Sequence, residues 1–342
     1  MPRSTLKFAT FNLYNLQLPG EAMYHGNTYS QTHYNKKIAW TAAMLQRMDA
    51  DIIGFQELWH PDALVDAFIE AGLDTEYTLV TKNFGRSIGT AMAVRNIHTV
   101  NSFEWIKDFP DELVLKKRRS TSSSGVPDYK ISVSAQYFAR PILKVVVKPS
   151  QGSASAPPIS LFVAHFKSKL PMGLDSEEQS DPSIKKHKAA IGNALSTIRR
   201  TAEAAALRIL LTKTMKGNKK PVVVMGDLND TEHSVTNTLV TADPTYRLFA
   251  TGRAGNTDVG LFASSSLQEY RNLRDVNFTH VFRGRHETLD HILVSEQFYD
   301  YSKNRVWSFK EMRVFNDFLG DKDKSTGDHA VVTSKFEYFP AP

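Results

Sequence analysis

Residues 222–230 read VVVMGDLND, so four apolar residues run directly into a short polar loop. The apolar part is rich in valine, and such a run bounded by turn residues is typical of a buried strand. Gly226, Asp227 and Asn229 are all common in turns, so a plain turn would explain the loop. A catalytic site at the end of a core strand would explain it equally well, and the rest of the chain decides between the two.

The length and composition are those of a folded globular protein. The chain has 342 residues, of which 41% are hydrophobic and 23% charged, and this is enough for a large core. Residues 121–128 are rich in serine and are interpreted as a loop. The segment 149–158 (PSQGSASAPP) separates two strand patterns and is interpreted as a long hairpin loop, not as a domain linker. We therefore expect one domain over residues 1–342.

Composition also excludes several kinds of site. The chain has no cysteine, which rules out disulfides, thiolate metal sites and cysteine nucleophiles. No run of eighteen apolar residues occurs, so no membrane-spanning helix is expected. The sequence shows no exposed aromatic hairpin of the kind that membrane binding needs, so stable membrane association is not expected either. Residues 1–13 pass directly into an alternating strand pattern and leave no room for a signal peptide. A cytoplasmic location is the default expectation, with secretion as the alternative if an export signal has been removed.

The charge balance favours an anionic partner. Lys and Arg number 42 against 36 Asp and Glu, which gives a formal net charge of +6. An excess of basic residues indicates a polyanion such as nucleic acid, although many basic proteins bind none. Nothing in the sequence indicates an oligomeric state.

Strand and helix patterns are mixed along the chain. Short apolar runs rich in Val, Ile, Phe and Thr predict strands at residues 6–13, 51–55, 90–95, 142–148, 159–164, 222–225, 289–294 and 330–336. Apolar residues at helical spacing predict helices at residues 34–48, 61–70 and 183–214. This order indicates an α/β domain with two packed sheets.

Polar side chains stand at one end of six of the predicted strands. The residues in question are Asn12, Gln56-Glu57, His165, Asp227 with Asn229, Asp290, and Asp328-His329. Such an oxygen-rich set suits a hard cation such as Mg²⁺, with Mn²⁺ or Ca²⁺ as alternatives, and suits zinc poorly. A divalent cation could stabilise charge on a phosphoryl oxygen, and a histidine beside a carboxylate could take a proton from water. The set therefore contains the groups needed for metal-assisted phosphoester hydrolysis.

In this order the segments resemble the endonuclease/exonuclease/phosphatase superfamily, which has the DNase I-like fold. The matching segments are ATFNLYNL, DIIGFQEL, VAHFKSK, VVVMGDLND, TLDHILVS and GDHAVV, and they extend from residue 9 to residue 332. The resemblance implies a four-layered α/β sandwich in which two packed mixed β-sheets are flanked by helices. Histidine in HFKSK resembles the bacterial nuclease branch and argues against abasic-site repair.

The resemblance also implies a role for each position. Glu57 would be the main metal ligand, with Asn12 and Asp328 beside the metal. Asp227 and Asn229 would orient the attacking water and the phosphate, and His165 would bind the phosphate or protonate the leaving oxygen. His329, partnered by Asp290, would contact the phosphate and act as general base, although Asp227 is the alternative base.

Three further features bear on substrate binding and on a second metal. Lys167 and Arg140 are candidate phosphate contacts, with surface positions as the plain alternative. The run from Lys116 to Arg119 either borders a substrate groove or is an ordinary solvated cluster. Tyr14 replaces an acidic residue found in many bacterial relatives, which argues against a second metal at the first strand.

The sequence thus predicts a Mg²⁺-dependent phosphodiesterase, and a nuclease acting on DNA or RNA above all. One alternative is a phosphatase or phosphodiesterase on a small or lipid phosphate, such as an inositol phosphate or sphingomyelin. The other is an inactive module that only binds phosphate. DNA versus RNA, internal versus terminal cleavage and base preference stay open, because groups directed at phosphate carry no sequence information.

Overall fold

The computed structural model of the protein describes residues 5–117, 131–150, 156–246, 259–272, 278–321 and 323–339. The predicted loop at 121–128, together with Arg118 and Arg119, lies outside the described residues. The middle of the predicted hairpin loop, at 151–155, lies outside them as well. Among the described residues, every helix is too short or too polar to cross a bilayer.

Twelve strands form two six-stranded sheets. The first sheet has the order β15-β16-β1-β2-β4-β3, with bounds Trp307–Phe315, Val331–Tyr338, Thr5–Leu16, Ile52–Leu58, Gly89–Arg95 and Tyr77–Val80. The second has the order β11-β14-β10-β9-β8-β5, with bounds Leu261–Ala263, Asp290–Ser295, Val222–Asp227, Ile159–His165, Tyr137–Lys148 and Thr99–Asp108. In each sheet the two central strands, β1 with β2 and β9 with β10, are parallel and all other pairs are antiparallel.

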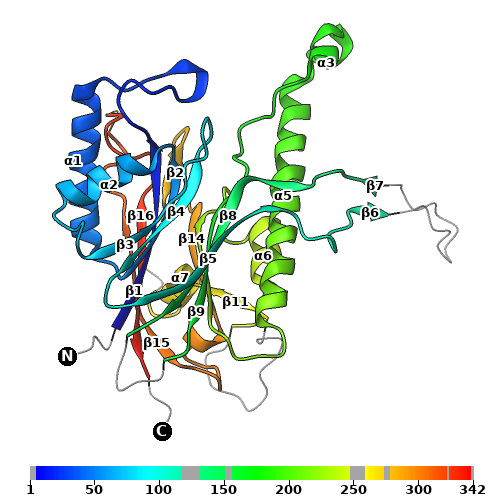
Figure 1. Ribbon diagram of the computed structural model, residues 1–342. Helices are drawn as coiled ribbons and strands as arrows, with labels where there is room; N and C mark the ends of the chain where they lie inside the picture. Colours follow the sequence, from blue (N-terminus) through cyan, green and yellow to red (C-terminus); the bar gives the residue numbers. More distant parts are fainter. Residues whose placement is uncertain are drawn as a thin grey trace, which may run out of the picture.

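Helices cover the outer face of each sheet (Figure 1). Helices α1 (Gln31–Met48) and α2 (Pro61–Glu70) share a buried apolar cluster with the first sheet. Helices α5 (Lys188–Met215) and α6 (Val235–Thr241) border a corresponding cluster on the second sheet. A third cluster lies between the sheets and is built from alternating inward residues such as Phe8, Met92, Val145 and Met225. The four-layered sandwich with two mixed sheets is therefore confirmed.

The remaining elements are short. They are α3 (Ser176–Ser180), α4 (Pro182–Lys185), α7 (Ser264–Glu269), the 3₁₀ helices η1 (Tyr24–Gly26) and η2 (Glu296–Phe298), and the strand pairs β6 (Lys116–Lys117) with β7 (Ile131–Ser132) and β12 (His280–Phe282) with β13 (Arg285–Glu287). Strands β8 and β9 pair with each other as an antiparallel hairpin.

The prediction of one helix over residues 183–214 is wrong in its first turns. The backbone leaves helical geometry at His187, so α4 and α5 are separate helices. The first half of α5 also runs beyond the body of the molecule (Figure 1), where no sheet covers it. Leu195 and Ile198 are 37% and 44% exposed as a result, whereas Leu207 and Leu211 in the second half are fully buried against the second sheet.

Strand direction explains why the polar residues meet. The parallel strands β1 and β2 end at the same edge as the start of β16, because β16 runs antiparallel to β1. The same relation holds for β9, β10 and β14 in the second sheet. Asp227 pairs with His165 on one side and with Asp290 on the other. Both sheets therefore present their polar strand ends on the same rim of the sandwich.

Candidate functional site

Gly226 is required by the close approach of two strands at this rim. Its φ is +142°, and a Cβ added there would lie 1.9 Å from the carbonyl oxygen of Ala164 on β9. Any other residue would meet a backbone clash and a strained conformation. The glycine in VVVMGDLND thus keeps β10 in register with β9 up to Asp227.

Left-handed backbone conformations gather at the same rim. Tyr14, Asn15, Glu57 and Asn229 have φ values of 47°, 59°, 60° and 54°. For residues other than glycine this conformation costs free energy and persists only where the surroundings enforce it. At Glu57 it coincides with a register shift between β2 and β4, which turns the carboxylate out of the strand toward the rim.

Asn12 connects the two sheets. Its buried Nδ2 donates to Glu57 Oε1 and to Asp227 Oδ2, each at 3.3 Å. The backbone N–H of Asn15 donates to the other oxygen, Glu57 Oε2, at 3.1 Å. The carboxylates of β2 and β10 are thereby held on either side of one amide.

The loop after β10 is a turn and a site at once. Asn229 N–H donates to Asp227 Oδ1 at 2.8 Å, which is the Asx-type bond of a tight turn. The Asn229 side chain donates from Nδ2 to Asp227 Oδ2 at 3.0 Å and to the Phe166 carbonyl at 3.1 Å. The turn therefore fixes both side chains over the end of the buried strand.

Two buried histidines face the Asp227 carboxylate. His165 Nε2 lies 3.6 Å from Asp227 Oδ2 and 3.9 Å from Glu57 Oε1. Burial and the nearby cation of Arg140 hold the pKa of His165 well below its usual range, so its ring is neutral. On the opposite side, His329 Nε2 lies 3.9 Å from Asp227 Oδ2.

Asp290 holds the second of these histidines. His329 Nδ1 lies 2.8 Å from Asp290 Oδ2, and both side chains are buried. Burial opposes protonation of His329, but the carboxylates of Asp290 and Asp227 outweigh it and raise its pKa well above the usual value. The ring is thus fixed in orientation and carries a proton that can be directed into the site.

Two carboxyl groups of the site have raised pKa values, chiefly because they are buried. Burial and the nearby Asp328 raise the pKa of Glu57, and burial raises that of Asp227 to about 7. Crowded carboxylates that resist ionisation are what a divalent cation would stabilise. Within the described residues, ligand atoms of Asp227, Asp290 and His329 lie within 4.8 Å of one another, as do those of His280, Asp328 and His329. The donor set therefore fits a hard divalent cation.

The structure brings the predicted core of the site together. Asn12, Glu57, His165, Asp227, Asn229, Asp290 and His329 form one connected set of contacts. Asp328 is exposed at the edge of this set. Strand β8 begins at Tyr137, five residues before the predicted start at residue 142, so Arg140 lies inside the strand. Its Nη1 donates to the Phe166 carbonyl at 3.0 Å.

The lysines are placed differently. The Lys167 ammonium donates to the Ser168 and Leu170 carbonyls at 3.1 and 2.9 Å, so it faces its own loop. Lys169 pairs with Glu287 at 2.8 Å. Lys116 and Lys117 form β6, which lies on an arm that extends away from the sheets (Figure 1). A phosphate contact by Lys167 stays a prediction.

Several residues near the site were not singled out from the sequence. The His280 ring lies 4.8 Å from that of His329, and its residue makes an isolated β-bridge with His329. Buried Glu203 on α5 accepts from the backbone N–H of Lys167 at 2.7 Å and of Ala139 at 2.8 Å. Fully buried Lys37 on α1 lies 5.2 Å from the centre of the Tyr14 ring and donates to the Thr326 carbonyl at 3.4 Å.

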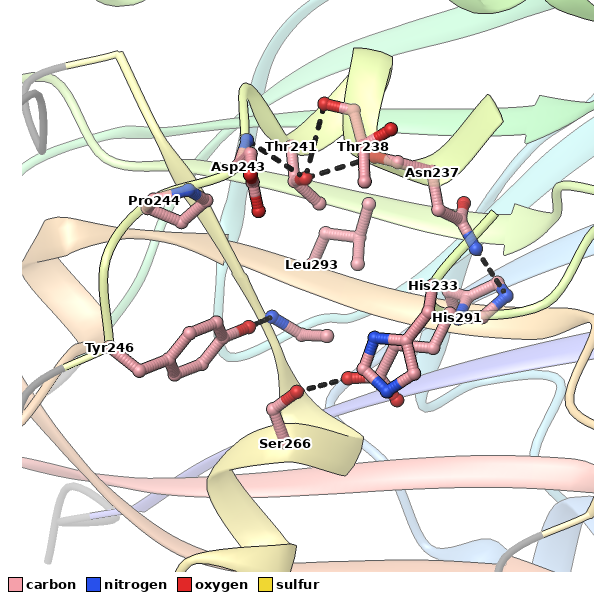
Figure 2. A pocket seen from close by; sticks show the side chains of 12 residues that line it. His233, Asn237, Thr238, Thr241, Asp243, Pro244, Tyr246, Ser266, His291 and Leu293 are labelled. Carbon is pink, nitrogen blue, oxygen red and sulfur yellow. Dashed lines mark hydrogen bonds between the residues drawn. The ribbon is translucent and has the colours of Figure 1, made fainter. Parts of the chain in front are cut away.

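A separate small hollow lies beside α6 and β11 (Figure 2). Its volume is about 60 Å³, and its lining includes His233, Asn237 and His291. His291 Nε2 lies 3.0 Å from Asn237 Nδ2 and 2.9 Å from the Asp230 carbonyl. These contacts give His291 a structural role.

The sequence matches the family model described as "Endonuclease/Exonuclease/phosphatase family" over residues 9–329. The chain belongs to this family. Members of the endonuclease/exonuclease/phosphatase family hydrolyse phosphoester bonds and typically depend on a divalent metal. Comparison with curated protein sequences gives no significant match.

Solved structures of the family are similar in fold at low sequence identity. A humanized D. rerio TDP2 carrying 14 mutations is 13% identical, with a TM-score of 0.55 over 98% of this chain and 100% of that one. An endonuclease/exonuclease/phosphatase from Bacteroides vulgatus is 14% identical, with a TM-score of 0.54 over 98% and 100%. The human Nocturnin catalytic domain is 13% identical, with a TM-score of 0.52 over 98% and 96%.

Proposed function

We propose that the protein is a divalent-metal-dependent phosphodiesterase, and specifically a nuclease, built as one domain over residues 1–342. The observation that carries this proposal is the arrangement of His329, Asp290 and Asp227. An oriented histidine and a buried carboxylate face each other at 3.9 Å beside Glu57 and Asn12. This combination supplies acid–base groups and metal-ligand oxygens at one rim.

Glu57, Asn12 and Asp328 would hold the cation, which is Mg²⁺ in this proposal with Mn²⁺ or Ca²⁺ as alternatives. When bound, it would neutralise charge on a phosphoryl oxygen and help activate water. The protein side chains would supply proton transfer and contacts to the phosphate. Asp227 Oδ2 receives hydrogen bonds from Asn12 and Asn229 and is the acceptor best placed to take a proton from the attacking water.

The two histidines would act on the phosphate. His329 carries a proton on a ring held by Asp290, so it would contact a phosphate oxygen as a cation. His165 is neutral and can donate one ring hydrogen to the phosphate or the leaving oxygen. Its Nδ1 is buried without a hydrogen-bond partner among the described residues. The tautomer with the hydrogen on Nε2 leaves only an acceptor unpaired at Nδ1 and directs the N–H toward Asp227 and the substrate.

A polyanionic substrate is favoured over a small one. The net charge is +6, and three basic residues lie near the rim: Arg140 on β8, Lys169 in the loop after β9, and Arg200 on α5. The human Nocturnin catalytic domain was solved with a bound sulfate anion, which is consistent with an anion site in this fold. We therefore propose DNA or RNA as the substrate, with inositol phosphate or sphingomyelin as the alternatives.

A substrate panel tests the proposal. Plasmid, single-stranded DNA, RNA, an inositol phosphate and sphingomyelin would each be incubated with Mg²⁺ and, separately, with EDTA. We expect cleavage of a nucleic acid with Mg²⁺ only. Turnover of the inositol phosphate or the lipid alone would replace the nuclease by a phosphatase, and no turnover at all would favour a phosphate-binding module.

A further inference from the structure

A large cavity opens beside the rim, on the side of the loop that follows β1. Its volume is about 470 Å³, within the range of roughly 300–1,000 Å³ that is usual for small-molecule sites. The lining includes Tyr14 and Asn15, which lie two and three residues after Asn12 in β1. Since the Asn15 N–H donates to Glu57 Oε2 at 3.1 Å, the cavity shares a wall with the candidate metal ligand.

The wall of the cavity is aromatic. Tyr14, Tyr24, Tyr29 and His33 all line it. The Tyr29 and His33 rings are stacked, with centroids 4.7 Å apart and an interplanar angle of 16°. Tyr24 is 46% exposed and rests edge-on against Trp59, with centroids 4.9 Å apart. One face of the Tyr24 ring is therefore available to a ligand.

Hydrogen bonds hold this aromatic wall against Asn15 at the end of β1. The Tyr29 hydroxyl donates to the Asn15 carbonyl at 2.9 Å, and the Trp59 indole N–H donates to Asn15 Oδ1 at the same distance. The loop itself is closed by Gly20 N–H, which donates to the Tyr29 carbonyl at 2.9 Å. The aromatic wall is thus positioned by the same Asn15 that contacts Glu57.

The polar groups of the cavity suit a heterocyclic base attached to a phosphate. Asn27, Thr28 and Ser30 offer neutral donors and acceptors, and among the described residues that line the cavity only Lys324 carries a permanent charge. His33 Nε2 is buried and has no hydrogen-bond partner among the described residues. Proteins that read single-stranded nucleic acid stack bases on aromatic rings and bond their edges with such neutral groups.

We propose that this cavity binds a nucleobase of the substrate, stacked on Tyr24, while the adjoining phosphate lies at the Glu57–Asp227 rim. The assignment rests on the proposed nuclease function for the identity of the ligand, but the binding step can be measured without hydrolysis. This assignment also implies one of two events when a base enters the cavity. The base is either flipped out of a double helix or already unpaired in a single strand.

The test compares AMP with ribose 5-phosphate, which lacks the base. Both are titrated by calorimetry in EDTA, so that metal-dependent turnover does not occur. We expect AMP to bind at least about tenfold more tightly than ribose 5-phosphate. Tyr24→Ala should weaken AMP binding by about 5- to 150-fold, the range expected for loss of one base–aromatic stack, and leave the binding of ribose 5-phosphate unchanged.

Two controls make the result specific. Tyr24→Phe keeps the ring and should keep the affinity for AMP. Tyr270→Ala removes a tyrosine that is similarly exposed, at 52%, outside the cavity and should change nothing. Equal affinity for the two ligands, an unaffected Tyr24→Ala variant, or equal losses in Tyr24→Phe and Tyr24→Ala would overturn the assignment.

The outcomes also separate this inference from the proposed function. Cleavage of nucleic acid without any preference for AMP would overturn the cavity assignment alone. Preference for AMP in a protein that cleaves no phosphodiester would support the cavity and overturn the nuclease.

Discussion

His329 Nδ1 and Asp290 Oδ2 lie 2.8 Å apart, in a part of the rim where both side chains are buried. Asp290→Asn would keep the shape of the side chain but remove the charge that orients the ring and raises its pKa. We expect the hydrolysis rate to fall by about 10²- to 10⁴-fold, the usual contribution of an acid–base group. Steady-state hydrolysis would be measured together with circular dichroism to establish that the variant folds.

The matched control for this prediction is Asp74→Asn, which alters an exposed aspartate just before β3, near the start of β2 and therefore at the opposite end of the first sheet from Glu57. It should retain the wild-type rate. An Asp290→Asn variant that folds and hydrolyses at the wild-type rate would remove the histidine–aspartate pair from the mechanism.

Asp227 makes stability depend on pH in the metal-free protein. Burial raises its pKa from 3.8 to about 7, so the folded protein holds a proton that the unfolded chain releases. The resulting stabilisation is complete below about pH 4 and disappears as pH rises to about 7. Asp227→Asn cannot titrate, so its free energy of unfolding relative to wild type should increase between pH 5 and pH 7 and then level off. Urea unfolding in EDTA at several pH values would measure this, and a constant difference would contradict it.

Gly226 tests the strand geometry beneath the site. Gly226→Ala would place a Cβ 1.9 Å from the Ala164 carbonyl oxygen at a φ of +142°, so we expect a loss of about 3 kcal/mol or more. Gly320→Ala is the control, because nothing lies within 4 Å of the added Cβ there. Thermal unfolding of the two variants should differ clearly. Equal melting temperatures would show that β9 and β10 do not approach as described.

Lys37 is a buried cation that opposes stability. Burial lowers its pKa to about 8, although the carboxylates of Asp328 and Glu57 favour the charge. The penalty is full below about pH 8 and fades as pH rises to 10.5. Lys37→Met should therefore raise the stability at pH 7, by up to about 3 kcal/mol, while the lost bond to the Thr326 carbonyl loosens the loop that carries Asp328.

We expect this variant to melt at a higher temperature and to have a kcat/KM about tenfold lower. Thermal unfolding and steady-state kinetics on the same preparation would measure both. A stabilised variant with unchanged kcat/KM would mean that Lys37 has no part in positioning the site. A destabilised variant would mean that its charge is better compensated than its surroundings indicate.

Much of the site could be predicted because it follows strand ends. Asn12, Glu57, His165 and Asp227 each end an apolar run, and parallel strands carry such ends to one edge. The turn chemistry of Asn229 was likewise visible in the sequence. Strand directions, and hence the meeting of two sheets at one rim, came from the resemblance and not from periodicity.

The remainder depended on tertiary structure. His280 begins a strand of only three residues, which is too short to give a recognisable apolar run in the sequence. Lys37 stands three residues after Tyr34, at the spacing of the buried helix face, and this was a signal that a lysine there is unusual. The exposure of Leu195 could not be inferred, because the spacing of apolar residues predicts a helix face but not where along its length the helix extends past the sheet that it packs on.

The most direct test of the catalytic account is the rate of hydrolysis of the best substrate in the panel by metal-depleted protein, before and after Mg²⁺ is added. We predict no cleavage without a divalent cation, full recovery with Mg²⁺, and a loss of at least about 10³-fold in Asp227→Asn under the same conditions. Cleavage in EDTA, or a folded Asp227→Asn variant with the wild-type rate, would contradict the account.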